Sequence, residues 1–108
     1  MTDVQQTLLA TYKTLQLQEG MLRAACSIEQ AKVLDENYSA ARKAYWEYMD
    51  RAFQNNDAEV EALAVQLNAV NGELSHSLEQ LNNINKVLQT ISVALALGIK
   101  LAARAAVL

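Results

Sequence analysis

Residues 87–108 read VLQTISVALALGIKLAARAAVL, and the need to cover this stretch decides how the rest of the chain is arranged. The stretch contains no acidic residue and only two basic ones, Lys100 and Arg104. A helix that is apolar on nearly every side needs cover on several sides. We therefore expect the segment to be buried against the rest of the chain, against sister chains or in a membrane. Its small residues recur at every fourth position and would form one stripe along a helix, composed of Ala94, Gly98, Ala102 and Ala106.

The composition indicates a single helical domain that spans residues 1–108. Hydrophobic residues make up 52% of the chain and charged residues 19%, which is not the composition of a disordered protein. There are three glycines and no proline. Because proline is common in turns and interrupts helices, its absence favours a few long helices with short connections. We expect an all-α fold.

A helical period runs through the first half of the chain. Apolar residues from Val4 to Ala52 follow spacings of three, four or their sums. Gly20 interrupts this pattern, but a single glycine costs only about 1 kcal/mol relative to alanine and does not end a helix. The pattern predicts a first helix over about residues 3–54.

Residues 54–57 carry the clearest turn signal, and a second helix follows them. Asn56 and Glu59 have the spacing of a capping box, which marks the start of a helix. From Val60 onward the apolar spacings are three or four residues, close to the heptad of a coiled coil with one extra residue near 74–78. The pattern predicts a second helix over about residues 57–107.

Two polar sites in the second helix, Asn71 with Gly72 and the run from Asn82 to Asn85, are places where it could break. The apolar period crosses both, which favours one continuous helix and therefore a long antiparallel helical hairpin. The antiparallel register places Leu8 beside the alanine-rich end of the second helix.

This hairpin would leave apolar surface uncovered. The first helix carries a second apolar stripe, from Leu17 to Tyr38, and exposed patches of that size usually mark an interface. We expect a homo-oligomer, most simply a dimer that completes a four-helix bundle, otherwise a larger assembly.

Two groups of residues are candidates for an interface or a membrane-facing surface. Aromatic residues gather near the predicted turn, where they either plug the end of the bundle or meet a partner or a lipid interface. In the second helix, the first helix does not cover the side that carries Lys100 and Arg104, so a partner or lipid would contact that side. The uncharged run between Lys86 and Lys100 is shorter than the roughly 20 residues that span a bilayer, although snorkelling cations could extend it. The candidates are Val93, Ala94, Leu97, Gly98, Leu101, Ala102, Ala106, Tyr45, Trp46, Met49 and Phe53.

The sequence contains no motif of an enzyme, a cofactor site or a metal site. His76 is the only histidine, and no His or Cys lies three or four residues from it, whereas a metal site needs several converging ligands. Cys26 is the only cysteine and is expected to pack as a small apolar residue. Nucleic-acid binding is not expected, because the net charge is −3 and no basic run exceeds two residues.

Three functions remain open at this point. The leading one is a non-enzymatic helical protein that self-associates, with the end of its C-terminal helix buried in the assembly. The second is a membrane-active protein, pore-forming or membrane-binding, that inserts its cationic apolar C-terminal segment. The C-terminal helix would contact a protein partner in the first case and lipid in the second.

The third function follows from a resemblance in length and hairpin form. The chain resembles the small helical proteins that bacteria export by the early-secretory-antigen route, and also needle subunits. The resemblance implies a secretion substrate or a structural subunit. The sequence departs from the Trp-x-Gly turn of the first family, because Trp46 is followed by Glu47 and Tyr48. The start, MTDVQQ, has no signal-peptide pattern, so we expect cytoplasmic synthesis and, for any export, a signal-independent route.

Overall fold

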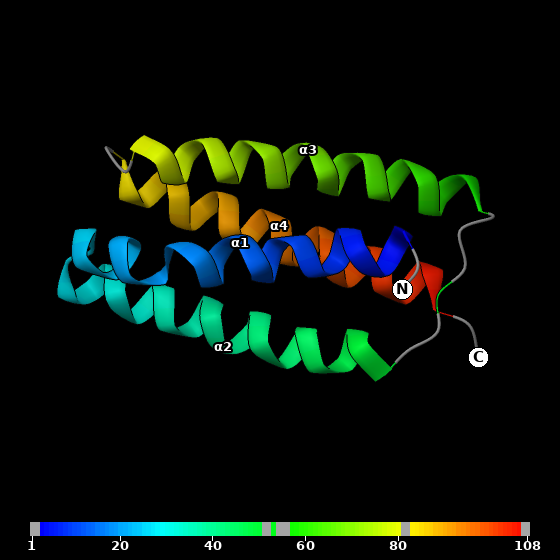
Figure 1. Ribbon diagram of the computed structural model, residues 1–108, viewed down its shortest axis with the longest axis horizontal. Helices are drawn as coiled ribbons and strands as arrows, with labels where there is room; N and C mark the ends of the chain where they lie inside the picture. Colours follow the sequence, from blue (N-terminus) through cyan, green and yellow to red (C-terminus); the bar gives the residue numbers. More distant parts are fainter. Residues whose placement is uncertain (1–2, 51–52, 54–56, 81–82, 107–108) are drawn as a thin grey trace.

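The computed structural model describes residues 3–50, 53, 57–80 and 83–106, and within them the chain is all-α as predicted. The helices align along the long axis of a molecule that measures 42 × 22 × 18 Å (Figure 1). They are α1 (Asp3–Ala25), α2 (Ile28–Asp50), α3 (Ala58–Gln80) and α4 (Ile84–Ala105).

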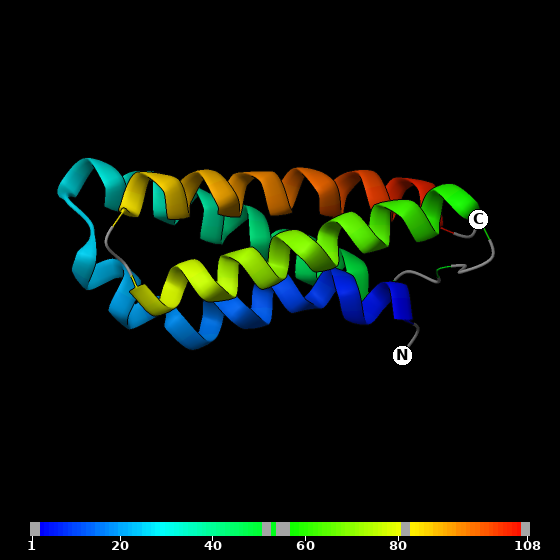
Figure 2. The same cartoon turned by 90° about the horizontal axis from the view of Figure 1, so that it is seen from above.

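The four helices form two antiparallel pairs that stack on each other. α1 pairs with α2 and α3 pairs with α4, and the two pairs meet where α1 packs on α3 and α2 packs on α4 (Figures 1 and 2). α1 also contacts α4 across the diagonal. Thus α1 and α4 each contact all three of the other helices, while α2 and α3 do not contact each other in the described part of the chain.

The prediction of two long helices over 3–54 and 57–107 is wrong, because each of them is divided in two. The first division falls at Cys26 and Ser27. The Gln30 backbone N–H donates to Ser27 Oγ at 3.2 Å, and the Ser27 N–H donates to Gln30 Oε1 at 2.9 Å. This reciprocal pair is a capping box, which satisfies backbone donors and so starts a new helix where the apolar period alone indicated continuity.

The second division falls within the run from Asn82 to Asn85. The Asn83 side chain accepts a hydrogen bond from the Lys86 backbone N–H at 3.2 Å and caps the first turn of α4. α3 is capped in a related way, because Asp57 Oδ1 accepts from the Glu59 N–H at 2.8 Å. The predicted cap Asn56 lies outside the described residues.

The other suspected break, at Asn71 and Gly72, lies inside α3 and does not interrupt it. Asn71 is buried and joins α3 to α1. The Thr11 hydroxyl donates to Asn71 Oδ1 at 2.6 Å, and Asn71 Nδ2 donates to the Thr7 carbonyl at 3.4 Å. A buried polar pair of this kind fixes how two helices are aligned, because sliding either helix would leave a polar group without a partner.

Two clusters of apolar side chains form the core. One lies toward the chain termini and includes Leu8, Leu67 and Leu101; the other lies toward the short connections and includes Leu15 and Ile91. Leu8 shares its cluster with the alanine-rich part of α4, as the antiparallel register predicted. One chain therefore supplies all four helices of its core. The hairpin prediction had expected two chains to supply them.

We predict that replacing Ser27 with alanine destabilises the fold. Loss of the capping hydrogen bond should lower the free energy of unfolding by about 1 kcal/mol. The matched control is Ser39→Ala, at an exposed position inside α2, where alanine's higher helix propensity should leave the stability unchanged or slightly raised. Urea unfolding followed by circular dichroism measures both, and equal stability of the two variants would contradict the assignment of the cap.

We also predict that Asn71→Ala lowers the free energy of unfolding by about 1–3 kcal/mol, because it removes the partner of the buried Thr11 hydroxyl. Asn68→Ala, at an exposed position on the same helix, should change it by less than about 0.5 kcal/mol. Chemical unfolding of the two variants compares them directly. An Asn71 variant as stable as the Asn68 variant would show that the polar pair does not hold α1 against α3.

Candidate interaction surface

α4 has one covered side and one open side. Its covered side faces the three neighbouring helices, which accounts for the burial expected of so apolar a segment. The buried residues of α4 are Val87, Leu88, Thr90, Ile91, Ala94, Gly98, Leu101, Ala102 and Ala105.

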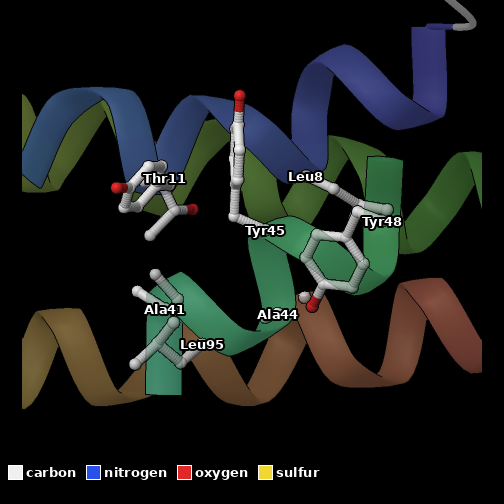
Figure 3. A pocket seen from close by; sticks show the side chains of 10 residues that line it. Leu8, Thr11, Ala41, Ala44, Tyr45, Tyr48 and Leu95 are labelled. Carbon is white, nitrogen blue, oxygen red and sulfur yellow. The ribbon is translucent and has the colours of Figure 1, made fainter. Parts of the chain in front are cut away.

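The small-residue stripe lies on the covered side and serves contacts within the chain. Ala94, Gly98 and Ala102 are buried, and Ala106 is half-buried. A Cβ placed on Gly98 would lie 3.4 Å from the Tyr48 hydroxyl oxygen. Figure 3 shows this hydroxyl directed toward α4. The stripe therefore lets side chains of α1 and α2 approach the α4 backbone closely, so it is not left for a separate partner.

A small hollow surrounds this close approach. Its lining comes from α1, α2 and α4 and includes Leu8, Thr11, Tyr45, Tyr48 and Gly98 (Figure 3). The hollow has room for about one water molecule. It is therefore a packing defect and is too small to be the binding site of an organic ligand.

The predicted open side of α4, with Val93, Leu97 and Leu101, is only partly correct. Val93 is 45% exposed, but Leu101 is fully buried and Leu97 packs against the first core cluster. The prediction failed because α3 of the same chain covers that side, whereas a hairpin has no third helix to do so. Ile99, which is 64% exposed, was missed. The exposed residues of α4 from its second turn onward are Gln89, Ser92, Val93, Ala96, Ile99, Lys100, Ala103 and Arg104.

The aromatic candidates divide between core and surface. Phe53 is buried and its ring centroid lies 6.4 Å from that of Tyr48, so these two close the end of the core. Tyr45 is half-buried and lies 4.6 Å from Tyr12, centroid to centroid. Trp46 is 65% exposed and is the aromatic candidate that remains open to a partner. The side chain of Met49 lies outside the described part of the structure.

The charges of α3 and α4 are segregated, and one cation is neutralised inside the chain. Arg104 Nη2 lies 3.0 Å from Asp57 Oδ2, and Arg104 Nε lies 3.2 Å from Glu59 Oε2. Lys86 and Lys100 form no ion pair with any residue that the structure describes. Two cations of α4 are therefore still available to an external partner.

Three other titratable side chains, His76, Tyr38 and Cys26, make contacts within the chain. His76 is exposed, with Nδ1 3.9 Å from Glu79 Oε2. Tyr38 is buried and its hydroxyl donates to the Leu15 carbonyl, and its pKa is raised above the usual range, mainly by burial. Burial also raises the pKa of the Cys26 thiol, which packs against the second core cluster. Among the described residues, no group of three or more His, Cys, Asp or Glu could hold a metal ion.

By length and composition, α4 is the one helix of the described chain that could cross a membrane. The uncharged run between Lys86 and Lys100 is too short by itself, but the helix Ile84–Ala105 as a whole is long and apolar enough despite its charges. Of its most apolar stretch, 44% is buried inside the protein. A helix at the centre of a soluble core passes the same test, so this property does not distinguish the two roles.

The chain matches no protein-family model, and searches of curated proteins and solved structures find no significant match. Its function must therefore be argued from its own surface. Two features of that surface bear on function. Large apolar side chains are exposed on it, and the described ion pairs leave Lys86 and Lys100 of α4 without a partner.

We predict that Gly98→Leu disrupts the close approach of α1 and α2 to α4. The added side chain would meet the Tyr48 hydroxyl and Leu8, and overpacking of this kind costs about 1–3 kcal/mol. Gly20→Leu is the matched control, because a Cβ at Gly20 has no neighbour within 4 Å. The control should gain up to about 1 kcal/mol from helix propensity. Thermal unfolding tests both, and a Gly98 variant as stable as the wild type would show that the glycine is not required there.

Proposed function

We propose that the protein is a non-enzymatic helical interaction protein that self-associates through apolar helix faces outside its core. The observation that carries this proposal is the set of large apolar side chains that stay exposed after the four helices have packed. They are Leu17, Met21, Ile28, Val33, Trp46, Val65, Val93 and Ile99. Contiguous apolar side chains on a surface usually mark an interface, and Leu17 and Met21 lie one turn apart on α1.

The energy available to association is substantial. Leu17 and Ile28 are 83% and 82% exposed, and burying such a side chain fully contributes about 1.5–3 kcal/mol. A few of them covered at once would offset much of the entropy that two chains lose on binding. In this proposal each associating unit is one chain with four helices. The sequence had instead predicted that two chains, each a two-helix hairpin, associate into one four-helix bundle. No catalytic step is part of the proposal.

A second candidate function is membrane activity, and the apolar length of α4 favours it. Insertion would require α4 to leave α1, α2 and α3, which would expose Ile91 and Leu101, both fully buried in the folded chain. Export as a small secretion substrate or subunit is compatible with the self-association that we propose, and the length and helical form of the chain support it.

The proposal predicts a mass above that of one chain at micromolar concentrations. Sedimentation equilibrium and light scattering measure this mass, and a chain that stays monomeric up to near-millimolar concentrations would refute the proposal. Leakage and binding assays with anionic vesicles provide the second readout. Vesicle leakage by a chain that is monomeric in solution would favour the membrane-active candidate instead.

A further inference from the structure

The open sides of α3 and α4 join into one continuous surface. A shallow hollow spans the two helices and is lined by Glu73 of α3 together with Lys86, Gln89 and Val93 of α4. Lys100 lies two turns after Val93 and so on the same side of the helix. We call this surface the α3–α4 face, and its exposed residues are Ala62, Gln66, Ala69, Glu73, Lys86, Gln89, Val93, Ala96 and Lys100.

The α3–α4 face carries charges of opposite sign on its two halves. α3 contains four glutamates and no base, while α4 contains two lysines and Arg104 and no acid. Within the described ranges, Glu73, Lys86 and Lys100 form no ion pair. Each half of the face therefore lacks the charge that the other half supplies. A surface of this kind is complementary to itself, as a two-fold symmetric interface must be.

The antiparallel geometry of α3 and α4 allows the two halves to meet in a dimer. A two-fold axis that lies in the face, parallel to the helices, places α3 of one copy against α4 of the other, running in the opposite direction. The Arg104 ion pairs show that the end of α4 is level with Asp57 and Glu59. Counting back along α4 by 1.5 Å per residue, Lys100 is level with Ala62 of the second copy, about one turn from Glu59, which also pairs with Arg104 of its own chain. Lys86 is level with the stretch between Glu73 and Glu79.

We propose that a second copy of this chain docks on the α3–α4 face, α3 on α4 and α4 on α3, in a symmetric dimer. The inference rests on the proposed self-association and assigns one contact of it to this face, which holds Val93 out of the eight large apolar side chains that stay exposed in the described part of the chain. The alanines at 62, 69 and 96 let the helices approach closely, and Val93, which is 45% exposed, is covered by the second copy.

An anionic lipid surface fits the same face less well. Lys86 and Lys100 would attract it, but the carboxylates of α3, including Glu59 and Glu73 beside the lysines, would repel it. A face that mixes both signs favours a partner that also carries both signs. The second copy is such a partner.

A pair of charge-reversal variants tests the dimer. The acidic chain carries Lys86→Glu and Lys100→Glu, and the basic chain carries Gln66→Lys and Glu73→Lys. In a homodimer of either variant, like charges face each other across the interface. Because the dimer is symmetric, every substitution occurs twice in that interface. The dissociation constant of each homodimer should rise at least about tenfold, whereas an equimolar mixture should form a heterodimer close to wild-type affinity. Sedimentation velocity and native mass spectrometry measure both.

A matched control reverses charges on the opposite pair of helices. Lys13→Glu and Lys32→Glu are exposed positions of α1 and α2 and should leave the dimer dissociation constant within about twofold of wild type. All the reversed positions are exposed, so circular dichroism should show an unchanged fold. A second readout needs no change of charge: in a Cys26→Ala background, an Ala69→Cys chain should form a disulfide with a Val93→Cys chain far faster than with itself.

The outcomes separate the face from the proposed function. If the wild type is oligomeric and both reversed chains keep its dissociation constant, the α3–α4 face is wrong and self-association stands on another face. If the reversed chains are monomeric but their mixture does not form a heterodimer, α3 does not dock on α4. A monomeric wild type overturns both proposals. Binding of that monomer to anionic vesicles, lost in the acidic chain, would assign the face to lipid instead.

Discussion

The covering of α4 is the constraint on which the rest of this structure depends. This helix is too apolar to lie on a surface, and its covered side meets all three of the other helices. At Gly98, a Cβ would already lie 3.4 Å from the Tyr48 hydroxyl oxygen and 3.8 Å from Leu8, so a longer side chain would meet both. Glycine and alanine at this stripe bring α1 and α2 near the α4 backbone, so the hydrophobic core forms within one chain.

Two capped breaks convert a long hairpin into a compact fold. The Ser27 and Gln30 capping box turns the first half of the chain back on itself, and the Asn83 cap does the same for the second half. A straight hairpin would have covered α4 on one side only. The folded-back pairs cover it on three, and the additional burial of apolar surface offsets the cost of two more helix ends.

The fold class and part of the topology could be predicted from the sequence. The lack of proline and the helical period indicate an all-α chain, and the asparagine run at 82–85 marks a break that the structure contains. The first break was missed because the apolar period continues through it, although the Ser-x-x-Gln pattern at Ser27 is a readable capping signal. The open side of α4 could not be predicted, because which of Leu101 and Ile99 is exposed depends on the positions of three neighbouring helices.

The α3–α4 face and the hydrophobic core contain residues from different sides of α4. Ala94, Gly98 and Ala102 face inward, while Val93, Ala96 and Lys100 face outward beside the acidic helix α3. Association through the outer side therefore needs no opening of the core. This separation also distinguishes self-association from membrane insertion, which would need the inward side of α4.

Amide hydrogen exchange of α4 tests most directly whether the chain itself covers this helix. If it does, amides around Ile91 and Leu101 should exchange only through global unfolding, as slowly as the free energy of unfolding allows, and at the same rate when the protein is diluted until it is monomeric. Protection of α4 that falls on dilution while α1 and α3 stay protected would contradict this account. It would show that α4 needs a second chain or another partner to cover it.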